Sequence, residues 1–360
     1  MTERSPIRVL IVDDSAFMRT ALSRMIASES GLEVVATAAS GADALDKIPA
    51  LNPDVVTLDV EMPGLDGLAT LQRIMHRFPR PVIMVSAATD KSAEITFQAL
   101  SAGAFDYVPK QLSETSLDIS HIRGDLVAKI RAAVRSPNPA NSNSRKPPRP
   151  AALDGAGGTV LPIIPDIVAL GVSTGGPKAL QEILPRLPHD LPVPILIVQH
   201  MPAGFTAPFA QRLNSLSSIT VREATHRELI QPATAYIAPT GLHMRVIRRL
   251  SDSRPMISLD ENPRNTLHVP SVDVLMDSVA TVYGNRALGI IMTGMGSDGA
   301  LGMKAIYRAG GFTIGQDRAT CTVYGMPRAC AEQGILSRIV PLAEIPEEVI
   351  RATRRRKRAS

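Results

Sequence analysis

Three residues in the second half of the chain have the side chains of an acyl-transfer site. Ser173 lies in Gly-Val-Ser-Thr-Gly, which fits the G-x-S-x-G pattern and follows the apolar run at 167–170. His200 ends the run ILIVQH, and Asp298 follows LGIIM in the glycine-rich stretch TGMGSDGA. A serine becomes nucleophilic when a base takes its proton, and a carboxylate fixes the tautomer of that base. These residues predict a triad in which Ser173 attacks, His200 is the base and Asp298 orients it.

The serine motif taken alone has other interpretations. A turn rich in serine, threonine and glycine also binds phosphate at a helix N-terminus, or simply caps the helix. The histidines decide, because among the seven only His200 stands directly after a buried-strand signal. The order serine, histidine, acid argues against an α/β-hydrolase, in which the acid precedes the histidine. We therefore expect the triad on a different fold.

The stretch from Gly294 to Gly299 offers a competing function. It matches G-x-G-x-x-G after a strand signal, and Asp317 follows 18 residues later, about where a dinucleotide site places its ribose acid. Asp298 would, however, direct a carboxylate into the loop meant for the pyrophosphate, and the motif comes near the end of its domain. We rank a nucleotide-dependent enzyme, and a binding module that needs no triad, below the serine hydrolase.

Charged and polar residues follow strand-like runs in the first half as well. Asp13 and Asp14 end the first run, Asp59 the third and Ser86 the fourth, and Lys110 follows the fifth. The carboxyl ends of parallel strands meet at one sheet edge, where three carboxylates repel each other unless a hard cation such as Mg²⁺ lies among them. A single aspartate would instead favour a helix cap or a turn. Together the five residues favour a phosphoryl-binding site with Mg²⁺.

The elements that must position both sites alternate between β-branched runs and helix-like segments. Such apolar runs are typical of strands buried on both faces of a parallel sheet, so we predict an α/β fold with two doubly wound domains. Residues 136–158, rich in proline, asparagine, serine and glycine, have the composition of a flexible linker. The predicted boundaries are 1–135 for the first domain, 136–165 for the linker, 166–348 for the catalytic domain and 349–360 for a basic tail.

Composition limits the classes of binding partner and the cellular compartment that we expect for this chain. With no tryptophan and 3% aromatic residues, the chain has few platforms for stacking bases, so we expect no nucleic-acid partner. The last ten residues carry six basic side chains and no acid, and without them the net charge falls from +5 to −1. Two cysteines, no signal-peptide pattern and no apolar run of membrane-spanning length predict a cytoplasmic chain without membrane insertion.

The first domain resembles a response-regulator receiver domain in the motifs VDDSAFMR, LDVEMPGLDG, VSA and DYVPK. The resemblance implies a five-stranded parallel fold, phosphorylation of Asp59 and a histidine kinase as phosphodonor. It implies these further roles: Mg²⁺ ligands at Asp13, Asp14, Asp59 and the carbonyl of Glu61, phosphoryl contacts from Ser86 and Lys110, and a switch aromatic at Tyr107. The sequence departs from the family at Gln111, where proline is common, and this affects the geometry expected for Lys110.

The second domain is similar to chemotaxis protein-glutamate methylesterases and glutamine deamidases. The matching stretches run in order: LGVSTGGPKAL, VQHMPAGFTAPFAQRL, AYIAP, VPSVDVLMDSVA, IIMTGMGSDGALGM and VYGMPRA. The resemblance implies a three-layer α/β/α fold with a mostly parallel sheet. It assigns the site residues as follows: the triad to Ser173, His200 and Asp298, oxyanion binding to backbone N–H groups near Met295, and support of the site to Thr174. Val172, where alanine is common, and the loop ATHRELIQPAT depart from the family pattern.

The resemblance further implies hydrolysis of glutamate γ-methyl esters on chemoreceptors with release of methanol, and deamidation of certain receptor glutamines. The hydrolase chemistry requires no metal, so Mg²⁺ belongs to the first domain. We hypothesise that the receiver covers the edge carrying Ser173 until Asp59 is phosphorylated, as a shift between two arrangements. The expected molecule is a monomer whose partners are methyl-accepting chemotaxis receptors and a histidine kinase.

Overall fold

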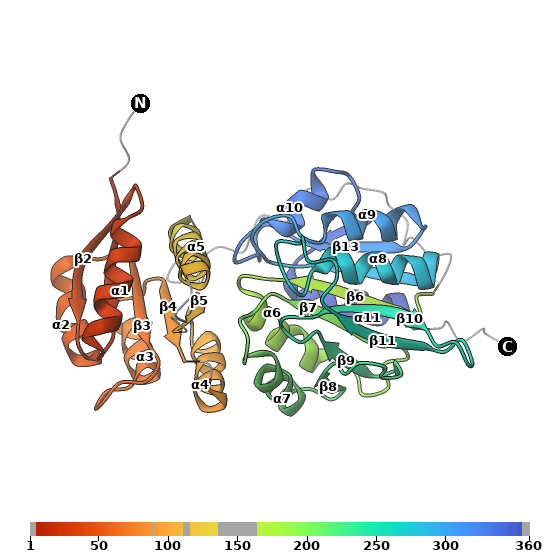
Figure 1. Ribbon diagram of the computed structural model, residues 1–360, viewed down its shortest axis with the longest axis horizontal. Helices are drawn as coiled ribbons and strands as arrows, with labels where there is room; N and C mark the ends of the chain where they lie inside the picture. Colours follow the sequence, from red (N-terminus) through yellow and green to blue (C-terminus); the bar gives the residue numbers. More distant parts are fainter. Residues whose placement is uncertain (1–4, 88, 111–115, 136–163, 355–360) are drawn as a thin grey trace. The chain divides into compact units, whose positions relative to one another are not determined.

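The structure is a computed structural model that describes residues 5–87, 89–110, 116–135 and 164–354. The chain divides into two compact units, residues 1–145 and 146–360 (Figure 1). Gln111, most of the predicted linker 136–165 and the end of the predicted basic tail lie outside the described residues. Within the described ranges, every helix is too short or too polar to cross a bilayer.

The first unit alternates five strands with five helices. Its strands are β1 (Ile7–Val12), β2 (Leu32–Ala38), β3 (Val55–Asp59), β4 (Val82–Ser86) and β5 (Asp106–Pro109). Its helices are α1 (Ala16–Ala27), α2 (Gly41–Leu51), α3 (Gly67–Arg77), α4 (Asp90–Ser101) and α5 (Ser116–Arg135). The strands pair in the order β2-β1-β3-β4-β5, and every pair is parallel.

Burial on both faces explains why these strands are apolar throughout. Val9 and Ile11 of β1 pack with residues of α1 and α5 in one core cluster. Successive side chains of a strand point to opposite faces, so Leu10 and Val12 face the other side, where α2, α3 and α4 contact the sheet. Helices on both faces of an all-parallel sheet confirm the predicted doubly wound first domain.

The second unit is larger and contains one sheet and one hairpin. Its strands are β6 (Ile167–Val172), β7 (Ile195–Gln199), β8 (Thr220–Glu223), β9 (Thr234–Ile237), β10 (His243–Arg248), β11 (Pro255–Asp260), β12 (Ala287–Ile291), β13 (Phe312–Gln316) and β14 (Arg338–Val340). Its helices are α6 (Gly176–Ile183), η2 (Leu184–Arg186), α7 (Thr206–Leu216), α8 (Val272–Tyr283), η3 (Gly284–Arg286), α9 (Ala300–Arg308), α10 (Met326–Ala331), η4 (Leu342–Glu344) and α11 (Ile345–Thr353).

Seven of these strands form a parallel sheet in the order β14-β13-β12-β6-β7-β9-β8, and β10 and β11 pair antiparallel beside it (Figure 1). Ile167 and Ala169 of β6 pack against α8, α9, α10 and the hairpin. Val168 and Leu170 face the opposite layer, which includes α6 and α11. The predicted three-layer α/β/α fold with a mostly parallel sheet is confirmed.

Helix α11 extends past residue 348, the predicted end of the catalytic domain. Helix α11 runs to Thr353, and Val349 and Ala352 on it are 3% and 6% exposed. Apolar residues at 345, 349 and 352 have helical spacing and bury one face against the sheet, whereas Glu347 and Arg351 lie exposed on the outer face. The basic composition therefore concealed the last turns of a packed helix.

Candidate active site and phosphoacceptor site

Ser173 stands at the end of β6, where the chain turns into α6. Its N–H donates to the carbonyl of Thr293, 3.0 Å away, which ties this turn to the segment after β12. Gly175 has a φ of +77°, and a Cβ there would lie 2.4 Å from the side chain of Thr322. Only glycine fits such a position, and the resulting tight turn leaves Ser173 partly exposed at the sheet edge.

His200 lies one strand along, directly after β7. Its N–H donates to the carbonyl of Val172 at 3.1 Å, and its Nε2 lies 2.8 Å from Oδ2 of Asp298. The His200 and Asp298 side chains are 9% and 12% exposed, so the pair is shielded from water. Nδ1 of His200 is buried and has no hydrogen-bond partner among the described residues. With Nε2–H donating to the carboxylate, Nδ1 keeps the lone pair that a general base needs.

Asp298 is held by the N-terminus of α8. Its Oδ1 accepts from the hydroxyl of Ser271 at 2.8 Å and from the N–H of Asp273 at 3.1 Å, and its Oδ2 accepts from the N–H of Val272 at 2.8 Å. Burial raises the pKa of Asp298, but the hydrogen bond and charge of His200 and the backbone donors outweigh burial and hold this pKa well below its ordinary value. The positive end of the helix dipole also favours the carboxylate.

Asp273, in the first turn of α8, makes the same kind of contact with the next helix. Its Oδ1 accepts from the N–H of Gly302 in the first turn of α9, 2.8 Å away. Burial raises the pKa of Asp273, the Gly302 N–H opposes this rise, and the charge of Asp298 adds to it. The N-terminus of α8 thus binds the carboxylate of Asp298, which lies just before α9, and the N-terminus of α9 binds the carboxylate of Asp273, which lies in α8. These two contacts fix the loop that carries Asp298.

Two further residues contact the triad, and the sequence carries a signal for only one of them. The ring of His268 stacks on that of His200, with centroids 4.0 Å apart and planes 23° from parallel. The amide Nε2 of Gln199 donates to the carbonyl of Ser173 at 3.1 Å and to that of His200 at 2.8 Å. A buried glutamine at the end of an apolar run is the one signal that points to Gln199, whereas His268 lies in an irregular polar segment.

Thr174 and Met295 both lie close to the serine. Thr174 is buried, and its carbonyl accepts from the hydroxyl of Thr293 at 2.9 Å. Met295 follows Gly294, at which a Cβ would lie 2.9 Å from the Cβ of Ser173. The loop after β12 therefore packs directly on the serine turn, and the oxyanion role of the backbone near Met295 stays a prediction. The unusual Val172 is buried in β6, and the loop ATHRELIQPAT joins β8 to β9.

The geometry of the loop from Gly294 to Gly299 disfavours the competing dinucleotide site. The Asp298 carboxylate is committed to His200 and the start of α8. Asp317, the candidate ribose acid, accepts from the N–H and hydroxyl of Thr320 at 2.9 and 2.6 Å and so stabilises a turn. Both acids of the supposed nucleotide site are therefore engaged within the protein.

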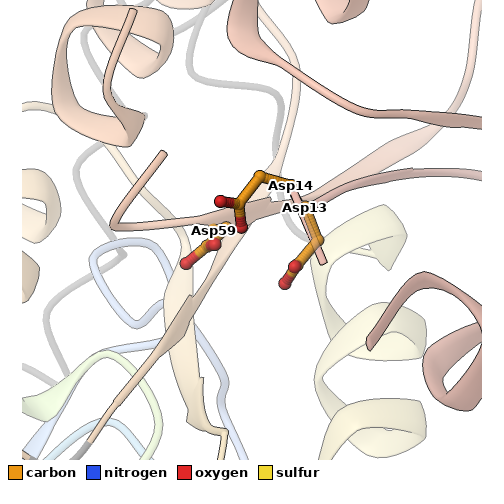
Figure 2. Close-up of side chains that lie close together, drawn as sticks. All are labelled: Asp13, Asp14 and Asp59. Atoms are coloured by element: carbon orange, nitrogen blue, oxygen red, sulfur yellow. The ribbon is translucent and has the colours of Figure 1, made fainter. Parts of the chain in front are cut away.

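In the first unit, the acids after β1 and at the end of β3 converge. Asp13, Asp14 and Asp59 each offer an oxygen within 4.8 Å of the others (Figure 2). Nζ of Lys110 lies 3.1 Å from Oδ2 of Asp13 and 2.6 Å from Oδ2 of Asp59. Asp13 and Asp59 are 0% and 1% exposed, so these two carboxylates share the Lys110 ammonium where water screens their repulsion poorly, and the exposed Asp14 adds a third negative charge beside them.

The charge of this cluster fits a divalent cation. Burial raises the pKa of Asp59 to about 6; the Lys110 hydrogen bond opposes the rise, and the charge of Asp13 adds to it. Three carboxylates stand against the single ammonium of Lys110, so negative charge is in excess at this cluster. Oxygen ligands with excess negative charge suit Mg²⁺, which Asp13, Asp14 and Asp59 would hold. The Glu61 carbonyl remains a predicted fourth ligand.

The predicted phosphoryl-contact residue Ser86 and the predicted switch residue Tyr107 lie on β4 and β5. Ser86 is buried, donates to the carbonyl of Ala87 at 3.2 Å and accepts from the hydroxyl of Thr96 in α4 at 2.8 Å. Tyr107 is 2% exposed and meets Phe97 edge to face, with ring centroids 6.4 Å apart. These contacts couple β4 and β5 to α4, whereas a role for Ser86 and Tyr107 in switching stays a prediction.

Comparison with known proteins accounts for both units. Residues 168–349 match the CheB methylesterase family, and residues 9–120 match the response regulator receiver domain. Protein-glutamate methylesterase/protein-glutamine glutaminase 2 of Nitratidesulfovibrio vulgaris is 47% identical over 369 residues, covering 96% of this chain and 98% of that protein. The chain belongs to the protein-glutamate methylesterase/protein-glutamine glutaminase family. A methylesterase/glutaminase of Pyrococcus abyssi is 42% identical over 358 residues, covering 96% of this chain and 93% of its own.

A solved structure supports the same assignment for the methylesterase domain. The catalytic domain of the Thermotoga maritima CheB methylesterase is 39% identical, with a TM-score of 0.50, and the match covers 52% of this chain and 98% of that one. The chain is accordingly a hydrolase of the protein-glutamate methylesterase and glutaminase class with a receiver domain. The predicted family and enzyme class are confirmed.

Asp59 is expected to be the phosphoacceptor of the receiver domain. The change Asp59→Asn removes the attacking carboxylate, so incorporation of radiolabelled phosphate from acetyl phosphate should fall to background. Chelation of Mg²⁺ should have the same effect on the wild type, because the cation offsets the charge brought together at the cluster. Asp54→Asn is the matched control, since Asp54 lies before β3 and accepts from the N–H of Arg8 at 2.8 Å. Wild-type labelling of Asp59→Asn would contradict the assignment.

Proposed function

We propose that this protein is a phosphorylation-activated serine hydrolase that removes methyl groups from glutamate γ-methyl esters of chemoreceptors and releases methanol. The same site deamidates specific receptor glutamines to glutamate. The protein acts in the cytoplasm as a monomer, with methyl-accepting chemotaxis receptors as substrates and a histidine kinase as phosphodonor. Membership of the methylesterase family and the receiver domain support this proposal.

One observation carries the chemical part of the proposal. Nε2 of His200 and Oδ2 of Asp298 lie 2.8 Å apart at the sheet edge that also bears Ser173. The adjacent strands β6 and β7 bring Ser173 and His200 to this edge, and the loop after β12, on the other side of β6, brings Asp298. An ionised Asp298 would stabilise the imidazolium that forms when His200 takes a proton.

The first half of the reaction forms an acyl enzyme. Nδ1 of His200 accepts the proton of Ser173 Oγ while that oxygen adds to the ester carbonyl carbon. Nδ1 is the base because Nε2 is committed to Asp298. The carbon–oxygen bond to the methoxy group then breaks, and the imidazolium returns its proton to the leaving oxygen, which gives methanol and a glutamyl ester of Ser173.

The second half regenerates the enzyme. Water gives a proton to His200 and adds to the acyl carbon; collapse of this intermediate then breaks the bond to Ser173 Oγ, which takes the proton back from His200, and leaves glutamate. With a glutamine substrate, ammonia leaves in place of methanol. Backbone N–H groups near Met295 would hold the oxyanion, since their loop packs on Ser173, and one such donor contributes about 3 kcal/mol to transition-state stabilisation.

Regulation belongs to the receiver domain in this proposal. The unphosphorylated receiver would restrict access to the edge that carries Ser173, and phosphorylation of Asp59 would shift the population toward an open arrangement. The phosphoryl group would interact with Lys110, whose ammonium lies 2.6 Å from the Asp59 carboxylate. Because Lys110 follows β5 and Asp59 ends β3, phosphorylation of Asp59 would alter contacts of both strands.

A truncated chain that begins at Pro165 is expected to release methanol from methylated receptor membranes faster than the unphosphorylated full chain. If about 10% of the full chain is open, removing the receiver raises the rate about tenfold. Initial rates of methanol release at equal enzyme concentration measure this, with the phosphorylated full chain as reference. Equal or slower turnover by the truncated chain would contradict inhibition, and no release by any of the three forms would contradict the esterase function.

A further inference from the structure

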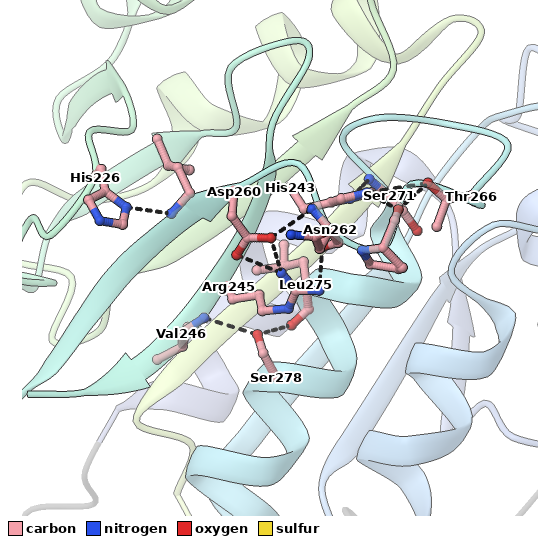
Figure 3. A network of polar contacts seen from close by, with 12 residues as sticks. His226, His243, Arg245, Val246, Asp260, Asn262, Thr266, Ser271, Leu275 and Ser278 are labelled. Atoms are coloured by element: carbon pink, nitrogen blue, oxygen red, sulfur yellow. Dashed lines mark hydrogen bonds and ion pairs between the residues drawn. The ribbon is translucent and has the colours of Figure 1, made fainter.

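A buried histidine outside the triad joins two points of the loop that leads from β11 to α8 (Figure 3). His243 is the first residue of β10 and is 0% exposed. Its Nδ1 lies 3.1 Å from the backbone N of Ser271, and its Nε2 lies 3.1 Å from the carbonyl oxygen of Pro263. One imidazole ring therefore bridges the beginning and the end of this loop.

These two contacts define the tautomer of His243. The N–H of Ser271 can only donate, so Nδ1 accepts, and the proton resides on Nε2, which donates to Pro263. Burial lowers the pKa of His243, the hydrogen bond to Pro263 opposes this, and the positive charge of Arg245 lowers the pKa further. The neutral ring that results is the only form that satisfies both ends of the loop.

The end of the loop held by His243 is the segment that holds Asp298. Ser271 is the N-cap of α8, and its hydroxyl donates to Oδ1 of Asp298 at 2.8 Å. The next two N–H groups, of Val272 and Asp273, donate to the same carboxylate. Three of the four donors to Asp298 therefore lie in the segment that begins at the residue bound by Nδ1 of His243.

Other contacts, from β10 and from the segment just before it, fix the same loop. Arg245, two residues along β10, donates from Nη1 to both carboxylate oxygens of Asp260 at 2.8 and 2.9 Å, and from Nη2 to the carbonyl of Asn262 at 2.6 Å (Figure 3). The N–H of Gly241 donates to the carbonyl of Val269 at 3.1 Å. The hairpin thus sets the path of the loop at several points, but only His243 reaches the cap of α8.

We propose that His243 is a positioning residue for the esterase reaction, acting through Ser271 on Asp298 and so on the tautomer of His200. The neutral imidazole places the N-terminus of α8 so that Asp298 receives its donors and still accepts from Nε2 of His200. This inference rests on the proposed function for its kinetic consequence. Its structural consequence, the geometry of the His200–Asp298 hydrogen bond, can be measured without any substrate.

Three variants of the full chain test the proposal by kinetics. His243→Gln removes the acceptor at the Nδ1 position, and we expect kcat for methanol release to fall 10- to 100-fold with KM within twofold, since small misplacement of reacting groups has effects of about this size. His243→Asn places an amide oxygen near the Nδ1 position and should recover most of kcat. His226→Gln is the matched control, because Nδ1 of the exposed His226 also accepts a backbone N–H, that of Leu259 at 3.0 Å, on the same hairpin.

Proton NMR provides the substrate-independent measurement. The Nε2 proton of His200, shared with Asp298, should give a low-field resonance that shifts or broadens in His243→Gln and is unchanged in His226→Gln. Wild-type kcat with an unshifted resonance in His243→Gln would overturn the proposal. If circular dichroism shows that this variant does not fold, His243→Asn decides: a folded Asn variant that loses more than tenfold in kcat overturns the proposal, and one that retains kcat supports it. Absence of methanol release by the wild type would refute the proposed function, and the resonance would still decide the role of His243.

Discussion

Replacing Ser173 with alanine should lower methanol release from methylated receptor membranes by about 10⁴- to 10⁶-fold. Alanine lacks the oxygen that forms the acyl enzyme, so neither the base nor the oxyanion donors can restore the covalent route. The turn should tolerate alanine, because the strict steric demand lies at Gly175 rather than at the serine. We expect the free energy of unfolding to change by less than about 0.5 kcal/mol. Initial rates and thermal unfolding of the two proteins measure both effects.

Ser297→Ala is the matched control for this substitution. Ser297 is exposed and lies in the loop after β12, next to Asp298, but it is not a member of the triad. Its removal should leave the rate within about threefold of the wild type, as for most surface substitutions. If Ser173→Ala retained activity comparable to that of Ser297→Ala, the covalent serine mechanism would have to be abandoned.

The change Asp298→Asn is expected to lower kcat by about 10³- to 10⁴-fold. The carboxylate accepts four hydrogen bonds, two at each oxygen. An asparagine has one carbonyl oxygen, so its NH₂ group must point toward one of these two pairs of donors. The two hydrogen bonds at that position are lost, and the NH₂ group faces other hydrogen-bond donors. The negative charge that fixes Nε2–H on His200, and that stabilises the imidazolium, is lost as well.

Stability should fall together with activity in this variant. The N-terminus of α8 loses its carboxylate, and buried donors lose an acceptor, so we expect a loss of about 1–3 kcal/mol in the free energy of unfolding. Asp317→Asn is the control, because Asp317 also caps a turn in this domain and would be the ribose acid of a nucleotide site. Near-wild-type kcat is expected for Asp317→Asn. A larger loss there than in Asp298→Asn would revive the nucleotide interpretation.

The doubly wound folds could be predicted because parallel strands buried on both faces are apolar at every position. The runs that became β6, β7 and β12 are of this kind, and each has its functional residue or loop at the carboxyl end. The hairpin of β10 and β11 left no such mark, since its strands mix buried with partly exposed residues and carry several charges. For the same reason α11, amphipathic and rich in charge, was placed partly in the tail.

The sequence by itself determined which residues stand at the carboxyl ends of the strands and so predicted the members of each site. Strand order in a parallel sheet brings strand ends together, so Ser173, His200 and Asp298, and likewise Asp13, Asp59 and Lys110, could be grouped from their positions alone. Only the tertiary structure decided how the triad is held: Nε2 of His200 faces Asp298, and the cap of α8 holds the carboxylate. These contacts join loops whose paths follow no periodic pattern, and side-chain hydrogen bonds between segments distant in the chain fix those paths.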